Sequence, residues 1–366
     1  MRRTPFYHLY RDRATIVAGG AWETPLRFTD NKTEHVATRT KVGLFDLSTM
    51  GEILVLGPGA KGFLDSMAVN SLANKKVGDV LYTTFCNENG GILDDVTVYV
   101  ISDSQYMVVT SNIFNCQKLL KWFAEYCPRE GVEIVDISSG FALASVQGPL
   151  SRDLLNSIAE NNINDINYFK FRNENVQGIK CLISRTGYTG ELGYEVYCPA
   201  ENAHSIYLAI HNAGCDFGLH LCGLEALQSL RIEKAYPLYG FDISESTNPY
   251  EAGLGWTVKL NKEFVGAKVL KDVKHNGPAK KLVSVKVKGS AMPQRGAEMW
   301  HNQEKAGVLT SICTSYSLEN SIIGLALVNA EFGADDTILE IRNENVIQCQ
   351  VQPGALYDPR GERLRM

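Results

Sequence analysis

Two adjacent carboxylates, Asp94 and Asp95, stand at the start of a run that alternates apolar and polar side chains over residues 96–100. The pair Gly90-Gly91 before this β-branched run predicts a tight turn that leads into a strand. Since residues two apart in a strand share a face, Asp94 lies with the valines and Asp95 with the more polar side chains. A carboxylate on an apolar face is costly to bury unless a partner compensates for it, so packing alone does not explain Asp94. Asp94 is therefore the first candidate for acid/base chemistry.

A second stretch, residues 185–197 (RTGYTGELGYEVY), places aromatic residues beside a carboxylate. Three glycines within seven residues predict a constrained loop that carries Tyr188, and the strand after it puts Glu195 and Tyr197 on one face. Such a ring can stack on a flat heterocycle while the carboxylate accepts two parallel N–H donors. A solvent-exposed glutamate beside a packed tyrosine fits the same spacing, so both interpretations stay open.

The run GPGAKG at residues 57–62 matches the G-x-G-x-x-G dinucleotide pattern between a predicted strand and a predicted helix. We interpret it as an ordinary strand–turn–helix corner, because the similar corner at Gly148-Pro149 has none of the other glycines and no doubly wound series follows. The two corners form a weak internal sequence repeat, which predicts two similar α+β units.

Length and composition describe a globular protein of two or three domains, since 366 residues exceed one ordinary core. A formal net charge of −5 argues against a nucleic-acid partner. The nine cysteines contain no C-x-x-C, so we expect neither a metal site nor a redox motif, and reduced thiols favour a cytoplasmic location. With no leader-like start and no run of about 18 apolar residues, we expect no membrane association.

The coarse element pattern favours an α+β fold. Helices are expected at about residues 114–126, 201–213 and 224–233. From about Lys280 onward, short alternating runs separated by Gly and Asn clusters predict a small all-β terminal domain, with residues 274–278 as the linker before it.

Several segments together carry a family resemblance. They are GAWETPL at 20–26, EHVATR at 34–39, GLFDLSTMGE at 43–52, residues 82–95, VQGP at 146–149, residues 185–195, YPLYG at 236–240 and EAGLGW at 251–256. In this order the chain resembles the aminomethyltransferase family, typified by the glycine cleavage T protein and including tetrahydrofolate-dependent demethylases. The resemblance runs from about residue 4 to residue 330 and more faintly to the end.

The resemblance implies a three-domain cloverleaf around a central channel that holds tetrahydrofolate. Residues 1–50 with 140–240 would form a first α+β domain, and residues 51–139 with 241–277 a second. Residues 278–366 would form a C-terminal β-barrel.

The resemblance also assigns roles to residues. Asp94 falls on the essential aspartate near the reacting N5/N10 edge of the folate, Glu195 on the glutamate that grips the pterin, and Tyr188 on a neighbouring pterin contact. Other expected folate-binding positions are Met50, Tyr82, Thr110, Tyr168 and Arg231. Asp94 would hold the attacking nitrogen and stabilise the cation that develops there, so Asp94→Asn should lose roughly two to four orders of magnitude in turnover.

Some positions depart from the T-protein pattern. Thr110 replaces an asparagine, Thr49 replaces a histidine, and Leu227 replaces an arginine that contacts folate in T proteins. For Arg231, pairing with Glu233 or Glu225 on the helix surface is the blander alternative to a folate contact.

Residues 229–234 and 356–365 look more like the folate domains of dimethylglycine and sarcosine dehydrogenases, although we expect no flavin domain in front of this one. The arginines at 360, 363 and 365 either attract the glutamyl tail of folate or form a plain charged terminus.

The leading expectation is a demethylase or methyltransferase that moves a methyl group from a small methylated amine, betaine or onium to folate N5. A glycine cleavage T protein, which needs a lipoyl carrier protein and releases ammonia, is the first alternative. A non-enzymatic folate-binding protein is the second.

Overall fold

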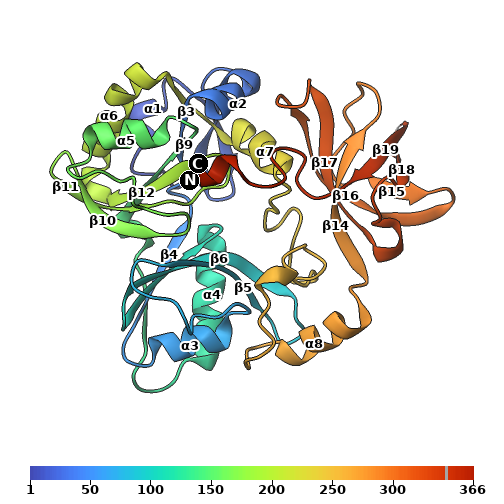
Figure 1. Ribbon diagram of the computed structural model, residues 1–366, viewed down its shortest axis with the longest axis horizontal. Helices are drawn as coiled ribbons and strands as arrows, with labels where there is room; N and C mark the ends of the chain where they lie inside the picture. Colours follow the sequence, from blue (N-terminus) through green and yellow to red (C-terminus); the bar gives the residue numbers. More distant parts are fainter. Residues whose placement is uncertain (343–344) are drawn as a thin grey trace.

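The computed structural model describes residues 1–342 and 345–366 and contains three large sheets arranged around the middle of the molecule (Figure 1). The first sheet has six strands in the order β10-β11-β12-β9-β3-β13. Its strands are β3 (Val42–Asp46), β9 (Phe141–Gln147), β10 (Phe171–Val176), β11 (Ile179–Ser184), β12 (Gly193–Pro199) and β13 (Leu219–Leu221). A hairpin of β1 (Thr15–Gly19) and β2 (Trp22–Arg27) precedes it.

Helices cover one face of this sheet, and alternation along the strands explains why. Ala142, Ala144 and Val146 of β9 are buried in one core, whereas Leu143 points into another. The helices of this region are α1 (Tyr7–Tyr10), α2 (Asn31–Thr40), α5 (Ser151–Ile158), α6 (Ala203–Gly214) and α7 (Leu224–Glu233). Residues of α1, α5 and α6 form the first core with the sheet.

The second sheet has five strands in the order β5-β6-β7-β4-β8. Its strands are β4 (Gly51–Leu56), β5 (Val80–Cys86), β6 (Ile92–Ser102), β7 (Gln105–Thr110) and β8 (Glu133–Asp136). Helices α3 (Ala60–Met67) and α4 (Ile113–Tyr126) pack on one face. The opposite face meets the first sheet in a shared core that includes Tyr99 and Val109 from one side and Leu143 and Tyr197 from the other.

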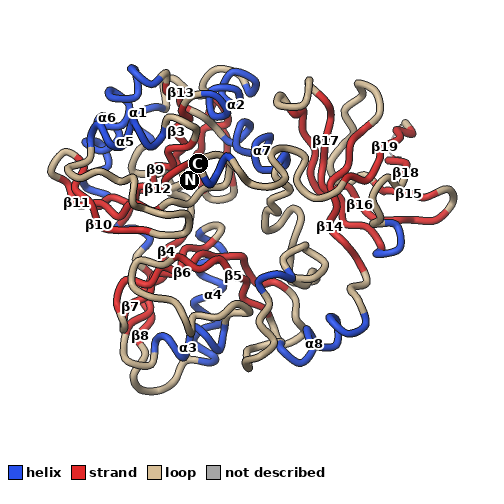
Figure 2. The backbone as a smooth tube through the Cα atoms, viewed as in Figure 1, coloured by secondary structure: helices blue, strands red, loops and turns tan. Residues whose placement is uncertain are grey.

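The third sheet is a closed barrel in the order β14-β17-β16-β15-β18-β19, as the alternating C-terminal runs predict. Its strands are β14 (Lys280–Val287), β15 (Glu298–His301), β16 (Glu304–Ser315), β17 (Ser321–Asn329), β18 (Ile338–Arg342) and β19 (Val346–Gln352). The predicted linker is partly wrong, because residues 274–276 form the end of α8 (Ala267–Asn276). Figure 2 shows that the connection from α7 to α8 is mostly loop and runs between the three sheets.

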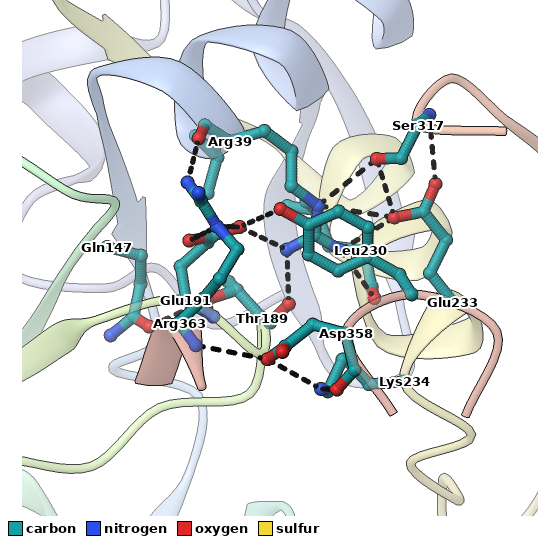
Figure 3. A network of polar contacts seen from close by, with 12 residues as sticks. Arg39, Gln147, Thr189, Glu191, Leu230, Glu233, Lys234, Ser317, Asp358 and Arg363 are labelled. Carbon is teal, nitrogen blue, oxygen red and sulfur yellow. Dashed lines mark hydrogen bonds and ion pairs between the residues drawn. The ribbon is translucent and has the colours of Figure 1, made fainter. Parts of the chain in front are cut away.

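A buried network of charges ties the barrel and the chain end to the first sheet (Figure 3). Arg39 of α2 lies 3.2 Å from Glu191 and 2.7 Å from Glu233 of α7. Ser317, in the turn between β16 and β17, donates to Glu233 over 2.9 Å, and Arg363 lies 2.8 Å from Glu191. Arg363 is therefore a structural ion-pair partner that fastens the C-terminal segment.

No helix within the described ranges combines the length and the apolar character that crossing a membrane requires.

Candidate active site

Asp94 lies on the face of β6 that packs against α4, as strand alternation predicts. Its side chain is fully buried and accepts three hydrogen bonds, from the Ser111 amide (3.0 Å), the Ser111 hydroxyl (2.6 Å) and the Asn115 amide group (2.7 Å). Burial and then the charge of Asp95 raise the pKa of Asp94, while the hydrogen bonds from Ser111 and Asn115 oppose the shift. The start of α4 thus supplies the compensation that a buried carboxylate needs.

Asp95 lies on the opposite face of the same strand, next to a pair of stacked aromatic side chains, of which the outer one is exposed to solvent. Tyr82 of β5 donates its hydroxyl to Asp95 over 2.9 Å. The Tyr82 ring stacks on Trp256, with centroids 6.0 Å apart and planes 19° apart, and Trp256 is 62% exposed. Burial raises the pKa of Asp95, and the hydrogen bond from Tyr82 opposes that shift.

Burial on the apolar face and a place beside the aromatic side chains, which the sequence leads us to expect together at Asp94, belong to two different residues. Asp94 is the carboxylate on the apolar face, but its oxygens already accept hydrogen bonds from Ser111 and Asn115 of the same protein. Asp95, which the sequence places with the polar side chains, is the carboxylate beside Tyr82. The alternation of the strand predicts these opposite positions of the two carboxylates.

A second aromatic pair approaches Asp95 from the first sheet and the segment after α7. The Tyr188 hydroxyl donates to the carbonyl of Pro237 over 2.5 Å, and its ring stacks on Tyr236, with centroids 5.8 Å apart. Burial raises the pKa of Tyr188, and Asp95 and Asp242 are among the charges that act on it. Burial, followed by the charge of Asp95, raises the pKa of Tyr82, and Tyr188 is among the groups that raise it further. The structure thus brings Tyr82, Tyr188 and Asp95 together.

Glu195 of β12 is 7% exposed, so the interpretation of a solvent-exposed glutamate is wrong. Its carboxylate accepts hydrogen bonds from the Thr186 hydroxyl and from Tyr99, 3.4 Å away. Tyr99 also lies 3.1 Å from the Tyr197 hydroxyl, in the core shared by the two sheets. Burial raises the pKa of Glu195 against these hydrogen bonds. The arrangement is a buried carboxylate beside Tyr99 and Tyr197, and the heterocycle-binding interpretation of Glu195 stays a prediction.

The remaining predicted positions lie at different depths. Met50 is half-buried and packs against the core shared by the two sheets. Tyr168 is half-buried and lines a small hollow together with Thr186 and Tyr236. Thr110 is fully buried, and its hydroxyl donates to the carbonyl of Asn112 over 2.9 Å at the start of α4. The Thr110 hydroxyl is thus bound within the protein.

Arg231 is fully buried, so its pairing with Glu233 or Glu225 on a helix surface is wrong. It forms an ion pair with Asp242 at 2.6 Å, and its other N–H groups donate to Gln228, Tyr236 and Ser311. The physical reason is that strand β16 of the barrel packs on α7. A guanidinium covered in this way needs a complete set of acceptors. These contacts occupy all five of its donors.

Sequence reasoning missed Asp95, Tyr239 and Asp242 as neighbours in this region. Burial and the charge of Glu245 raise the pKa of Tyr239, and the charges of Asp94 and Asp95 raise it further; Asp242 adds to the effect of burial on the pKa of Asp95. Tyr239 lies within the YPLYG segment, which identified the family without indicating a position in space.

The assembled site combines a carboxylate whose pKa is raised with aromatic rings that can stack on a planar ligand. A carboxylate of this kind can exchange a proton nearer to neutral pH and can stabilise a cation that develops beside it. Glu195 offers a second buried carboxylate to the N–H groups of a heterocycle.

Comparisons with known proteins agree along the whole chain. The GCVT N-terminal domain matches residues 7–262, and the glycine cleavage T-protein C-terminal barrel domain matches residues 280–358. An aminomethyltransferase of Halothermothrix orenii is 38% identical over 349 residues, which are 94% of this chain and 97% of the relative. One of Bacillus cereus is 40% identical over 364 residues, 98% of each chain.

The crystal structure of the glycine cleavage system aminomethyltransferase T from Bartonella henselae has a TM-score of 0.91 to this fold, at 26% identity and 98% coverage of both chains. Its likeness extends the sequence matches to the arrangement of all three sheets. This chain therefore belongs to the glycine cleavage T-protein family of aminomethyltransferases, which are tetrahydrofolate-dependent transferases.

Proposed function

We propose that this protein is an aminomethyltransferase that moves a one-carbon unit from an aminomethyl group on a lipoyl carrier protein to tetrahydrofolate and releases ammonia. The names of the curated relatives favour this reaction over the methyl transfer expected first from the sequence. The observation that supports it is the position of Asp95, which accepts a hydrogen bond from Tyr82 and, in addition to burial, raises the pKa of Tyr188.

The side chains present fit a pteridine. Glu195 is a buried carboxylate that can accept parallel N–H donors from the pterin edge, and Thr186 and Tyr99 hold it in place. Tyr82, Tyr188 and Tyr168 offer stacking faces, and Met50 adds an apolar contact. We do not assign Thr110 or Arg231 to the ligand, because their polar groups are hydrogen-bonded within the protein.

In the mechanism that we propose, Asp95 holds the attacking folate nitrogen by accepting its hydrogen bond. Tyr82 keeps that carboxylate in one orientation. As the nitrogen bonds to the transferred carbon, Asp95 stabilises the positive charge and accepts the proton that the nitrogen loses. The carbon–nitrogen bond of the donor breaks as this first nitrogen bonds to the carbon, and the proton taken up by Asp95 leaves with ammonia. The carbon–sulfur bond breaks as the second folate nitrogen bonds to the same carbon, and the proton lost by that nitrogen ends on the carrier sulfur as a thiol, which leaves methylene-folate. Asp94 keeps β6 fixed to α4.

A matched pair of variants tests these roles. Asp95→Asn should lose roughly two to four orders of magnitude in turnover and keep its affinity for folate, since a single acid/base group is removed. Asp94→Asn places an amide against the Ser111 and Asn115 donors, so we expect a loss of stability of about 1–3 kcal/mol. The assay measures ammonia and methylene-folate formed from aminomethyl-loaded lipoyl protein, and unfolding gives the stability. Near wild-type turnover in Asp95→Asn would exclude it as the reacting carboxylate.

Methyl transfer is the second candidate, and the exposed ring of Trp256 beside Tyr82 favours it. Aromatic faces next to a carboxylate can hold a methylated cation. Mass spectrometry of the folate products after incubation with methylated amines, betaines and sulfonium compounds distinguishes the two reactions. Methyl-folate formed from a free small molecule would replace the first proposal.

A further inference from the structure

A lysine–tyrosine contact joins α4 to the segment that follows α7. The Lys118 ammonium lies 2.6 Å from the Tyr239 hydroxyl oxygen and 4.1 Å from the centroid of its ring. It also lies 3.3 Å from a carboxylate oxygen of Glu245. The Lys118 side chain is 27% exposed, while that of Glu245 is 54% exposed. Lys118 is therefore directed inward, onto Tyr239.

Tyr239 lies close to the candidate active site. It is half-buried and packs, together with Tyr82, against one hydrophobic core. Burial raises the pKa of Tyr239, and the charges of Glu245, Asp94 and Asp95 raise it further. The hydroxyl therefore keeps its proton across the physiological range.

The chemistry of the two side chains decides which of them donates the hydrogen bond between Lys118 and Tyr239. An ammonium group has only donors, so the Tyr239 oxygen must be the acceptor of the contact with Lys118. Tyr239 retains its own O–H as a donor, and within residues 1–342 and 345–366 no hydrogen bond takes it up. Asp94 already accepts three hydrogen bonds, whereas Asp95 accepts one side-chain donor, Tyr82.

Helix α4 carries both contacts on one face. Asn115, which donates to Asp94 over 2.7 Å, stands three residues before Lys118, and residues three apart are neighbours on a helix surface. The same helix turn thus contacts one carboxylate of the pair, through Asn115, and Tyr239, through Lys118.

We propose that Lys118 is a positioning residue that donates to Tyr239 and thereby aims the Tyr239 hydroxyl as a hydrogen-bond donor at the reacting centre beside Asp95. The inference rests on the proposed function of the same site. Lys118 acts through Tyr239, and its contact with Glu245 on the outer side contributes no catalysis.

The test compares four single variants and one double variant in the aminomethyl-transfer assay. Lys118→Met and Tyr239→Phe should each lower kcat by roughly tenfold or more, with KM for folate changed by less than about twofold. Lys118→Arg, which keeps a cationic donor, should recover most of kcat. Glu245→Gln removes the other partner of Lys118 and should leave kcat unchanged. The double variant Lys118→Met/Tyr239→Phe should be no slower than Tyr239→Phe, because both changes remove one interaction.

Each outcome separates the two proposals. A wild-type protein that forms no methylene-folate from the loaded carrier would overturn the proposed function, whatever the variants do. With an active wild type, the role of Lys118 is overturned by unchanged kcat in Lys118→Met, by an equal loss in Glu245→Gln, or by losses that multiply in the double variant. A fall in thermal stability that Lys118→Arg does not reverse, without a change in kcat, would show a structural contact only.

Discussion

At the scale of single residues, Asp94 and Asp95 show that adjacent carboxylates on one strand can have different surroundings. Both pKa values are raised, chiefly by burial. Asp94 is compensated by Ser111 and Asn115 at the start of α4, and Asp95 by Tyr82 alone among the side chains of the described ranges. The less occupied carboxylate is the one with capacity left for a ligand.

The raised pKa of Asp95 predicts the pH dependence of the reaction. As the proposed proton acceptor, Asp95 must be ionised, so kcat/KM should rise with pH along a limb that lies well above the ordinary aspartate pKa of 3.8. Tyr82→Phe removes the hydrogen bond that lowers this pKa, so the limb should move to still higher pH. A pH profile of kcat/KM for both proteins measures the shift, and a limb that stays in place or moves down would contradict it.

Glu52 provides a stability prediction outside the reacting centre. Its side chain is 2% exposed, and burial raises its pKa from 4.5 to about 8, with a further contribution from Asp136. A carboxyl whose folded pKa is raised stabilises the fold fully below the unfolded pKa, and this contribution is lost as pH rises towards the folded value. Glu52→Gln keeps a neutral group there.

We therefore expect the Tm of the wild type to fall relative to that of Glu52→Gln between roughly pH 5 and pH 8. Thermal unfolding of both proteins at the two pH values measures the difference between their Tm values. The contributions of other titrating groups are the same in both proteins and therefore cancel in this difference. A constant difference would mean that Glu52 is ionised in the folded protein throughout this range.

At the scale of elements, the two strand–turn–helix corners are built alike. Gly57 after β4 and Gly148 after β9 both have positive φ, at 106° and 128°, and each leads to a helix of eight residues. Asp65 in α3 and Asn156 in α5 each accept the backbone amide seven residues further along the chain. The repeated geometry supports two similar α+β units and explains the glycine pattern of residues 57–62 as a turn.

Substitutions in this glycine pattern should have opposite effects on stability. A Cβ at Gly57 would meet the carbonyl oxygen of Gly131 at 2.3 Å, at a φ that side chains rarely adopt, so Gly57→Ala should destabilise the fold by more than about 1 kcal/mol. Gly62 lies inside α3 with nothing near its added Cβ, so Gly62→Ala should stabilise the fold by about 0.5–1 kcal/mol.

Urea unfolding of the two variants measures both effects. A dinucleotide cradle would require Gly62 as well, so loss of folded protein or of activity in Gly62→Ala would reopen that interpretation.

At the scale of the whole molecule, the network around Arg39 decides how the barrel and the chain end join the first sheet. Arg39 is the cation shared by Glu191 and Glu233, which are both fully shielded, and these carboxylates also bind Arg363 and Ser317 (Figure 3). Removing one member of a buried ionic network leaves its partners without compensation, and this costs more than the intact network contributes.

Arg39→Met should accordingly destabilise the protein by about 3–5 kcal/mol. Arg363→Met should cost less, because the Arg363 side chain is 34% exposed and water can replace part of its contacts with Glu191. Urea unfolding at constant pH measures both values. Equal losses in the two variants, or a loss below about 1 kcal/mol in Arg39→Met, would contradict the assignment of Arg39 as the centre of the network.

The amino-acid sequence alone determined the family, the terminal barrel, the helices at α4, α6 and α7, and the opposite orientation of Asp94 and Asp95. These properties depend on residues close in the chain, where periodicity sets which side chains share a face. Only the tertiary structure decided that Asp95 meets Tyr82, whose ring stacks on Trp256, that Glu195 is buried, and that Arg231 pairs with Asp242. The physical reason is that burial and ion pairing depend on surfaces brought together from distant parts of the chain, such as β16 against α7.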